Sequence, residues 1–316
     1  MRTYVLKRTL SLVPTLVGVT ILVFLMIRLI PGTVVDQLIG AEARVDESTK
    51  AAMRAFFGLD QPVYVQYFNW ISGVVQGDLG RSWRSSFPVS RMISDRLAVT
   101  GELALLALLI SLLVGVPLGT LSAVLENRAV DHVIRVASLL SLSIPIFWQA
   151  AMLILAFSLW LNWVPPAEYT PPTRSLTSNL TQMAMPAVVL GTVVAAQVMR
   201  MTRASLLEVM RNDYIRTARA KGVAENAVVR RHAFKNAMIP IITVIGVQIG
   251  YLLGGAVVTE EVFTLPGVGR LVLNAVYERD YPLVQGTILC IAGIFMLTNL
   301  LVDLAYAYLD PRVRYE

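Results

Sequence analysis

Long apolar runs alternate with short polar segments along the whole of this chain. A helix needs roughly 20 apolar residues to cross a bilayer, and six runs approach that length. We therefore predict an all-α polytopic membrane protein with six transmembrane helices. The predicted spans cover residues 9–29, 100–125, 133–161, 185–202, 239–259 and 285–308.

Proline residues fall inside or at the edges of several of these runs. Membrane helices tolerate proline where neighbouring groups satisfy the freed backbone carbonyls. We expect kinks near Pro117 and Pro145.

The two longest segments between spans on the outer side differ in character. Residues 30–98 include helical-period apolar residues at 52–57, 64–75 and 89–97, which predicts a small extracytoplasmic cap. Residues 162–184 contain four prolines, which predicts a stiff connector without regular structure.

Composition and charge agree with a membrane protein and set its orientation. Hydrophobic residues make up 56% and charged residues 15% of the chain, and the mean hydropathy is +0.64. With the N-terminus inside, the cytoplasmic side holds sixteen lysine and arginine residues against three in the short outer loops. The positive-inside rule therefore predicts a cytoplasmic N-terminus and C-terminus. The first apolar run is long enough to be a retained span rather than a cleaved signal.

One strongly basic segment separates the fourth and fifth spans. Between Met199 and Pro240 nine basic residues face three acids, a net charge of +6 that equals the charge of the whole chain. Within it, Asn212 and Asp213 can cap a short helix that ends in a left-handed turn at Gly222. A second helix over 225–238 then leads to the fifth span. The small residues Ala218 and Gly222 predict a smooth face for a soluble partner.

Several chemistries are excluded or disfavoured. The chain contains no phosphate-binding G-x-x-x-x-G-K-[ST] loop, so it cannot hydrolyse ATP by that mechanism. His132 and His232 stand alone and the single cysteine, Cys290, lies in an apolar run, so we predict no metal site and no bound cofactor. The basic excess sits between membrane spans, which disfavours nucleic acid as a partner.

The basic segment also carries a family resemblance. The stretches from Asp213 to Gly222 and from Arg231 to Pro240 resemble the coupling loop of inner-membrane permeases of ABC importers, in the dipeptide, oligopeptide and glutathione branch. Further matching stretches occur in the same order along the chain, namely Phe57 to Pro62, Gly77 to Gly80, Thr259 to Phe263, Leu265 to Gly269, Arg279 to Tyr281 and Asp310 to Tyr315.

The resemblance implies a type I importer permease that works with several partners. These are a second homologous permease, two cytoplasmic ATPases that bind ATP and magnesium, an extracytoplasmic solute-binding protein and membrane lipid. Where the broader superfamily has Glu-Ala-Ala before the glycine, this chain has Arg216, Thr217 and Ala218. The ATPase-coupling residues implied are Asp213, Tyr214, Ile215, Arg216, Thr217, Ala218, Arg219, Ala220, Lys221 and Gly222.

Polar residues within the spans are candidates for the translocation pathway, because burying them in lipid is costly. Gln149, Gln197 and Gln248 are the ones we select, although each could instead bridge two helices. Glycines at 246, 250, 254 and 255 favour close helix packing in the fifth span.

We predict a permease subunit that carries peptides or peptide-like solutes across a bacterial inner membrane. It has a cytoplasmic stub and first helix at 1–29, an extracytoplasmic segment at 30–98, a core at 99–308 with its coupling loop at 203–238, and a tail at 309–316. The alternatives are a secondary transporter driven by an ion gradient, disfavoured because Arg28, Glu102 and Asp303 lie toward span ends, and a membrane enzyme. The solute itself is not evident from the sequence.

Overall fold

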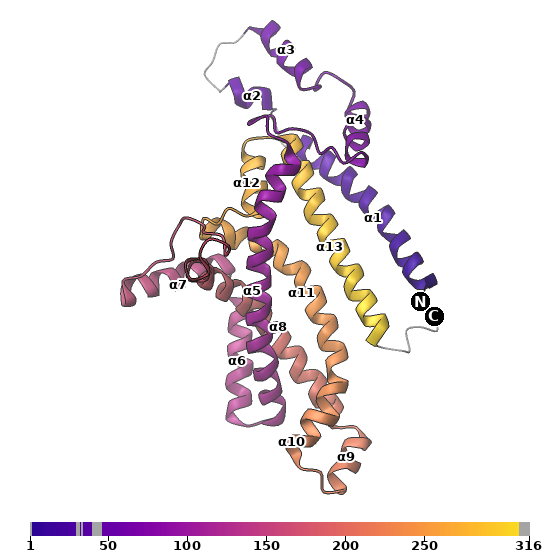
Figure 1. Ribbon diagram of the computed structural model, residues 1–316, viewed down its shortest axis with the longest axis vertical. Coiled ribbons are helices and arrows are strands. Elements are labelled where there is room, and N and C mark those ends of the chain that lie inside the picture. The colour runs from indigo at the N-terminus through magenta and orange to yellow at the C-terminus, as the bar shows by residue number, and fades with distance from the viewer. Residues whose placement is uncertain (1, 30–31, 33, 40–45, 310–316) are drawn as a thin grey trace. The chain divides into compact units, whose positions relative to one another are not determined.

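A computed structural model describes residues 2–29, 32, 34–39 and 46–309, and within them the chain is helical without a regular strand (Figure 1). This confirms the all-α prediction. The chain divides into two compact units. One comprises residues 1–5, 100–265 and 297–316, and the other comprises residues 6–99 and 266–296. The tail at 310–316 lies outside the described residues.

Four described helices are long and apolar enough to cross a membrane, and the number rises to six if each of two bent pairs forms one span. Three of them, α1 (Arg2–Leu29), α5 (Val89–Val124) and α13 (Tyr281–Leu309), cover the predicted first, second and sixth spans, the second up to Val124. The fourth, α8 (Leu176–Met210), contains the predicted fourth span. The fifth span lies in α11 (Phe234–Val262).

The predicted third span is not one straight helix. It is divided into α6 (Ala129–Ser143) and α7 (Ile146–Leu161), whose axes differ by 106°. Ile144 is extended and Pro145 caps the start of α7, so the break falls where proline cannot continue the helix. The predicted kink near Pro145 is confirmed, whereas α5 continues through Pro117 without interruption.

The predictions for the two outer segments need correction. Helices α2 (Val34–Ile39), α3 (Glu47–Phe56) and α4 (Val63–Val75) lie in the first segment, but residues 89–97 form the beginning of α5 rather than a separate cap helix. In the second segment α8 begins at Leu176, after Ser175 caps it by accepting a hydrogen bond from the backbone N–H of Ser178. The irregular connector is therefore shorter than predicted, because the prolines end at Pro172.

The smaller unit, residues 6–99 and 266–296, packs around a buried cluster that includes Val89, Tyr281 and Leu283. A buried carboxylate organises its edge. Asp280 follows α12 (Val268–Tyr277) and accepts hydrogen bonds from Ser82 Oγ at 2.5 Å and from the backbone N–H of Trp83 at 3.1 Å. A fully buried carboxylate needs such donors, because an unpaired buried charge is costly.

Replacing that carboxylate should loosen the segment it holds. Asp280→Asn keeps the volume but faces the same donors with an NH2 group, so we expect the free energy of unfolding to fall by about 1–3 kcal/mol. Limited proteolysis should detect new cleavage between residues 82 and 87. Glu278→Ala, at an exposed position nearby, is the matched control. Equal protection of both variants would contradict a structural role for Asp280.

In the larger unit, residues 1–5, 100–265 and 297–316, two glycines let helices α5 and α8 approach closely. A methyl group at Gly115 would lie 2.8 Å from the backbone oxygen of Ala195, and one at Gly119 would lie 2.5 Å from the backbone oxygen of Met199. The pair forms a G-x-x-x-G pattern, which permits close backbone packing of membrane helices. Gly246 in α11 similarly faces Val302 of α13, whereas Gly254 has open space.

A larger side chain at the crossing should separate these two helices. We expect Gly119→Leu to lower the stability of the detergent-solubilised protein by about 1–3 kcal/mol, because the neighbouring atom is backbone and cannot turn aside. The readout is the midpoint of thermal unfolding. Gly254→Ala is the control, since nothing lies within 4 Å of the added methyl. An unchanged midpoint for Gly119→Leu would show that the helices do not meet there.

Candidate functional site

The basic segment contains a short helix, α9 (Asp213–Ala220), which packs on the ends of α8 and α11 (Figure 1). Asn212 is at its N-cap without a side-chain hydrogen bond, so burial rather than capping holds the helix. Ile215 is fully buried and Ala218 is 8% exposed. Both pack in one cluster with Leu206 of α8 and Ile241 of α11.

This packing corrects the prediction about the docking face. Ala218 does not offer a smooth surface to a partner, because its side chain faces the core of the chain itself. Ile215 is inside for the same reason. Helical spacing of three residues places these two apolar positions on one side. The remaining residues of the predicted coupling set are exposed, namely Asp213, Tyr214, Arg216, Thr217, Arg219, Ala220, Lys221 and Gly222.

The exposed side chains of α9 differ in what they contact. Arg219 makes two hydrogen bonds to Glu225, at 2.6 and 3.0 Å, and these raise the pKa of the Arg219 guanidinium. The Arg216 side chain pairs with Asp213 of its own helix, at 3.2 Å, and is 81% exposed. Arg219 therefore joins α9 to the following segment, whereas Arg216 extends into solvent.

Gly222 forms the predicted left-handed turn, with a φ of +79°. The backbone N–H of Gly222 donates to Arg219 at 2.9 Å, and that of Val223 donates to Ala218 at 3.2 Å. These two bonds satisfy carbonyls at the end of α9 in the manner of a Schellman motif. Glycine suits the position because an added side chain at this φ is strained.

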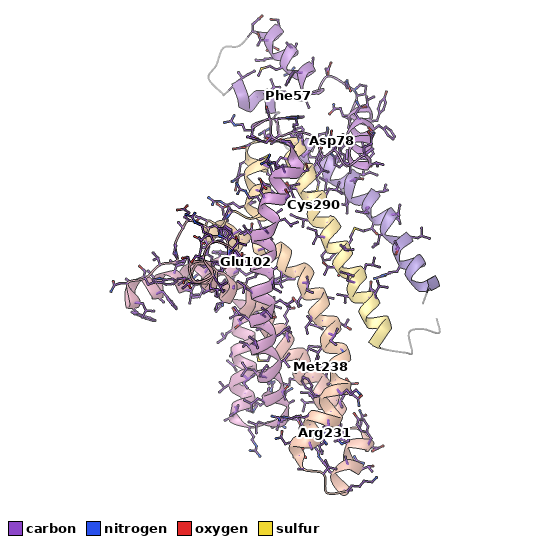
Figure 2. The ribbon with its side chains drawn as sticks, in the orientation of Figure 1. Phe57, Asp78, Glu102, Arg231, Met238 and Cys290 are labelled. Carbon is purple, nitrogen blue, oxygen red and sulfur yellow. The ribbon has the colours of Figure 1, made fainter. Side chains whose placement is uncertain are left out.

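The predicted second helix is more complex than one regular element. It consists of α10 (Glu225–Ala227), a π-helical turn η1 (Val228–Ala233) and the start of α11, which continues past Pro240. The axes of the segments Glu225–Met238 and Pro240–Leu252 differ by 50°. Figure 2 shows Arg231 near the end that carries α9, with Met238 farther along α11.

Two of the three selected glutamines meet, and the third does not join them. The Nε2 of Gln248 in α11 donates to the Oε1 of Gln197 in α8. Both line a cleft of about 720 Å³ between α6, α8 and α11. Gln149 of α7 instead donates to Thr192 Oγ1 at 2.8 Å and does not line that cleft.

A buried ion pair beside this cleft was not predicted from the sequence. Asp131 is fully buried and accepts two hydrogen bonds from Arg203, each 2.8 Å long. Ser122 Oγ and the backbone N–H of Asn127 donate to the same carboxylate, at 2.6 and 3.1 Å. The sequence places Asp131 and Arg203 beside two different predicted spans, but no local pattern indicates that these opposite charges pair.

Two further carboxylates in the larger unit have partners. Glu260 is fully buried and accepts a hydrogen bond from Thr100 Oγ1 at 2.5 Å. Glu102 accepts one from Tyr169 in the proline-rich connector at 2.6 Å; Figure 2 labels Glu102 on α5. The pKa of the Tyr169 hydroxyl is raised, mainly because the group is buried and secondly because of this hydrogen bond. In the part of the chain that the structure describes, no three His, Cys, Asp or Glu residues are grouped to hold a metal.

Comparison with known proteins places these features in a family. Residues 115–315 match the family model described as binding-protein-dependent transport system inner membrane component, and residues 1–104 match the model of its N-terminal region. A putative peptide transport system permease protein of Brucella abortus is 42% identical, with both chains covered completely. The dipeptide transport system permease protein DppB of Alkalihalophilus pseudofirmus is 39% identical over all of both chains. DppB of Escherichia coli is 39% identical over 99% of each.

Solved structures support the fold. A chain of the MetNI methionine ABC transporter, in inward facing conformations, matches with a TM-score of 0.56 and 17% identity over 69% of this chain and 96% of its own. A chain of an amino acid ABC transporter crystallised with histidines matches with a TM-score of 0.50 and 18% identity, over 71% and 94% respectively. These findings do not favour the ion-gradient alternative. The chain belongs to the binding-protein-dependent transport system inner membrane component family, the membrane permeases of ABC importers.

Proposed function

We propose that this chain forms half of the translocation pathway of an ATP-driven importer for peptides or peptide-like solutes. The observation that carries the proposal is the position of α9, whose apolar side is buried against α8 and α11 while its basic side is exposed. The full-length similarity to dipeptide and peptide permeases supports the solute class. Dipeptides, longer peptides and glutathione all remain within that class.

The proposed assembly adds four kinds of component to this chain. A second homologous permease completes the pathway, two cytoplasmic ATPases bind ATP and magnesium, a solute-binding protein delivers the solute from outside, and lipid surrounds the spans. Both termini and α9 face the cytoplasm, in keeping with the positive-inside rule. Residues 30–98 lie outside and the coupling loop at 203–238 lies inside.

Coupling follows from how α9 is anchored. When the ATPases close, they displace α9 through its exposed residues. Because Ile215 packs with Leu206 of α8 and Ile241 of α11, a displacement of α9 is transmitted to both helices. Gln197 and Gln248 lie farther along the same two helices, so the motion reaches the cleft they line. Such rigid-body motion is a common route to alternating access.

The test of this function is ATP-dependent uptake in reconstituted vesicles. We expect the complete transporter to accumulate a labelled dipeptide, and the purified chain alone to show no ATP hydrolysis, because it has no phosphate-binding loop. Gly222→Asp should reduce uptake by about tenfold or more, because strain at this φ costs roughly 1–2 kcal/mol and the new charge lies at the docking end.

Two controls separate the causes of a Gly222→Asp defect. Gly222→Ala carries the same backbone strain without the charge, so it should retain more uptake than the aspartate variant. Membrane content of each variant, measured by quantitative blotting, excludes loss of the protein itself. Wild-type uptake by a stably inserted Gly222→Asp protein would refute a coupling role for this turn.

A second prediction concerns Arg216, whose exposed guanidinium is available to acidic groups on an ATPase. Arg216→Glu should reduce co-purification of the ATPases, and the loss should be greater at low salt than at high salt, because salt screens charges across a solvated interface. Arg128→Glu, the same charge reversal at an exposed position outside α9, is the matched control. Equal yields for Arg216→Glu and wild type at every salt concentration would exclude an electrostatic contact.

A further inference from the structure

The cleft between α6, α8 and α11 has an unusual charge balance for a hollow among membrane helices. Three arginines line it, Arg135, Arg200 and Arg203, and no acidic side chain does. Arg203 is neutralised by Asp131, which lies behind the lining. Among the described residues, neither Arg135 nor Arg200 has an ion-pair partner. The cleft therefore presents two uncompensated positive charges.

One residue of the cleft lining, Gln248, carries an unsatisfied polar atom. Gln248 is only 6% exposed, and its Nε2 donates a hydrogen bond to Gln197. Its Oε1 is buried and has no hydrogen-bond partner. Leaving a buried acceptor unpaired costs about 1–3 kcal/mol. A ligand that brought a donor to this atom would recover that cost.

Together these groups match one chemical pattern. A guanidinium binds a carboxylate through charge-assisted hydrogen bonds, and the carboxamide oxygen accepts from an N–H. A free peptide C-terminus has both partners, a carboxylate and the amide N–H of its last residue. The volume of about 720 Å³ lies within the range of about 300–1,000 Å³ usual for small-ligand sites.

We propose that this cleft binds the C-terminal residue of the transported peptide during passage. Arg135 and Arg200 bind its carboxylate, and the Oε1 of Gln248 accepts its amide N–H. Gln197 holds the Gln248 side chain in position through their shared hydrogen bond. This assignment rests on the proposed peptide transport and adds the part of the peptide that the permease recognises.

Protection of an engineered cysteine from labelling reports whether the cleft is occupied. The assay omits the solute-binding protein, because that protein could itself select carboxylates. In a Cys290→Ser background with cysteine-free partner subunits, Ala204→Cys places a thiol in the cleft lining. The two permeases and two ATPases, assembled in lipid nanodiscs without the solute-binding protein, are then labelled with a maleimide. The added probes are alanyl-alanine, its C-terminal amide and acetate. Val247→Cys is a second reporter in the same lining, in case the first variant does not assemble.

We expect alanyl-alanine to slow the labelling at concentrations about tenfold lower than the amide requires, a difference that corresponds to one charge-assisted contact. Acetate should protect less than the dipeptide, because it lacks the N–H. Arg135→Gln together with Arg200→Gln should remove the preference for the acid. Arg128→Gln, at an exposed position before α6, should keep it. Gln248→Leu should reduce the difference between the concentrations of alanyl-alanine and of acetate that protect the cysteine equally.

Equal protection by the dipeptide and its amide would overturn the proposal, and so would an unchanged preference in the double arginine variant. Uptake by the wild-type transporter distinguishes this failure from failure of the proposed function. A transporter that carries dipeptides but shows no selective protection refutes the cleft assignment alone. A transporter that carries no peptide refutes both.

Discussion

The contact on which the proposed coupling depends is the burial of one face of α9 against α8 and α11. An eight-residue helix is too short to be stable by itself in water. Here Ile215 and Ala218 fill a cluster with Leu206, Ala237 and Ile241, and burial of such side chains supplies the stabilisation that capping does not. The contact fixes the direction in which the basic residues extend. It also joins α9 to α8 and α11, two of the three helices that line the cleft.

Several buried carboxylates among the apolar helices are paired with specific partners. Asp131 receives donors from Arg203, Ser122 and Asn127, and Glu260 receives one from Thr100. Each pair links segments that are distant in sequence or joins a turn to a helix. Because unpaired groups are costly in a medium without water, these bonds limit the arrangements available to the helices. The Oε1 of Gln248 has no such partner, and we assign it to the proposed peptide site because Gln248 also lines the cleft that carries the arginines.

Much of the fold was predictable because its signals are local. Apolar run length located the spans, Pro145 marked the break within the third, and Gly222 marked the end of α9. The parts that could not be predicted depend on distant contacts. The inward face of α9 is set by packing against α8 and α11, and the pairing of Asp131 with Arg203 joins residues far apart in sequence. The helical signal at residues 89–97 was present, but only the structure joins it to α5. The roles of the coupling residues and of the three glutamines stay predictions.

The bend between α6 and α7 restricts its surroundings. At about 1.5 Å per residue, the fifteen residues of α6 extend about 22 Å and the sixteen of α7 about 24 Å. Neither length equals the roughly 30 Å of a bilayer core, so the turn at Ile144 and Pro145 falls at membrane depth if the two helices together form a span. Carbonyl groups freed at such a turn cannot face hydrocarbon without a partner. Ser143 Oγ already donates to the carbonyl of Leu139 beside the bend. If α6 and α7 form one span, the remaining freed carbonyls must meet water, a neighbouring helix or a polar side chain, which keeps lipid away from this position.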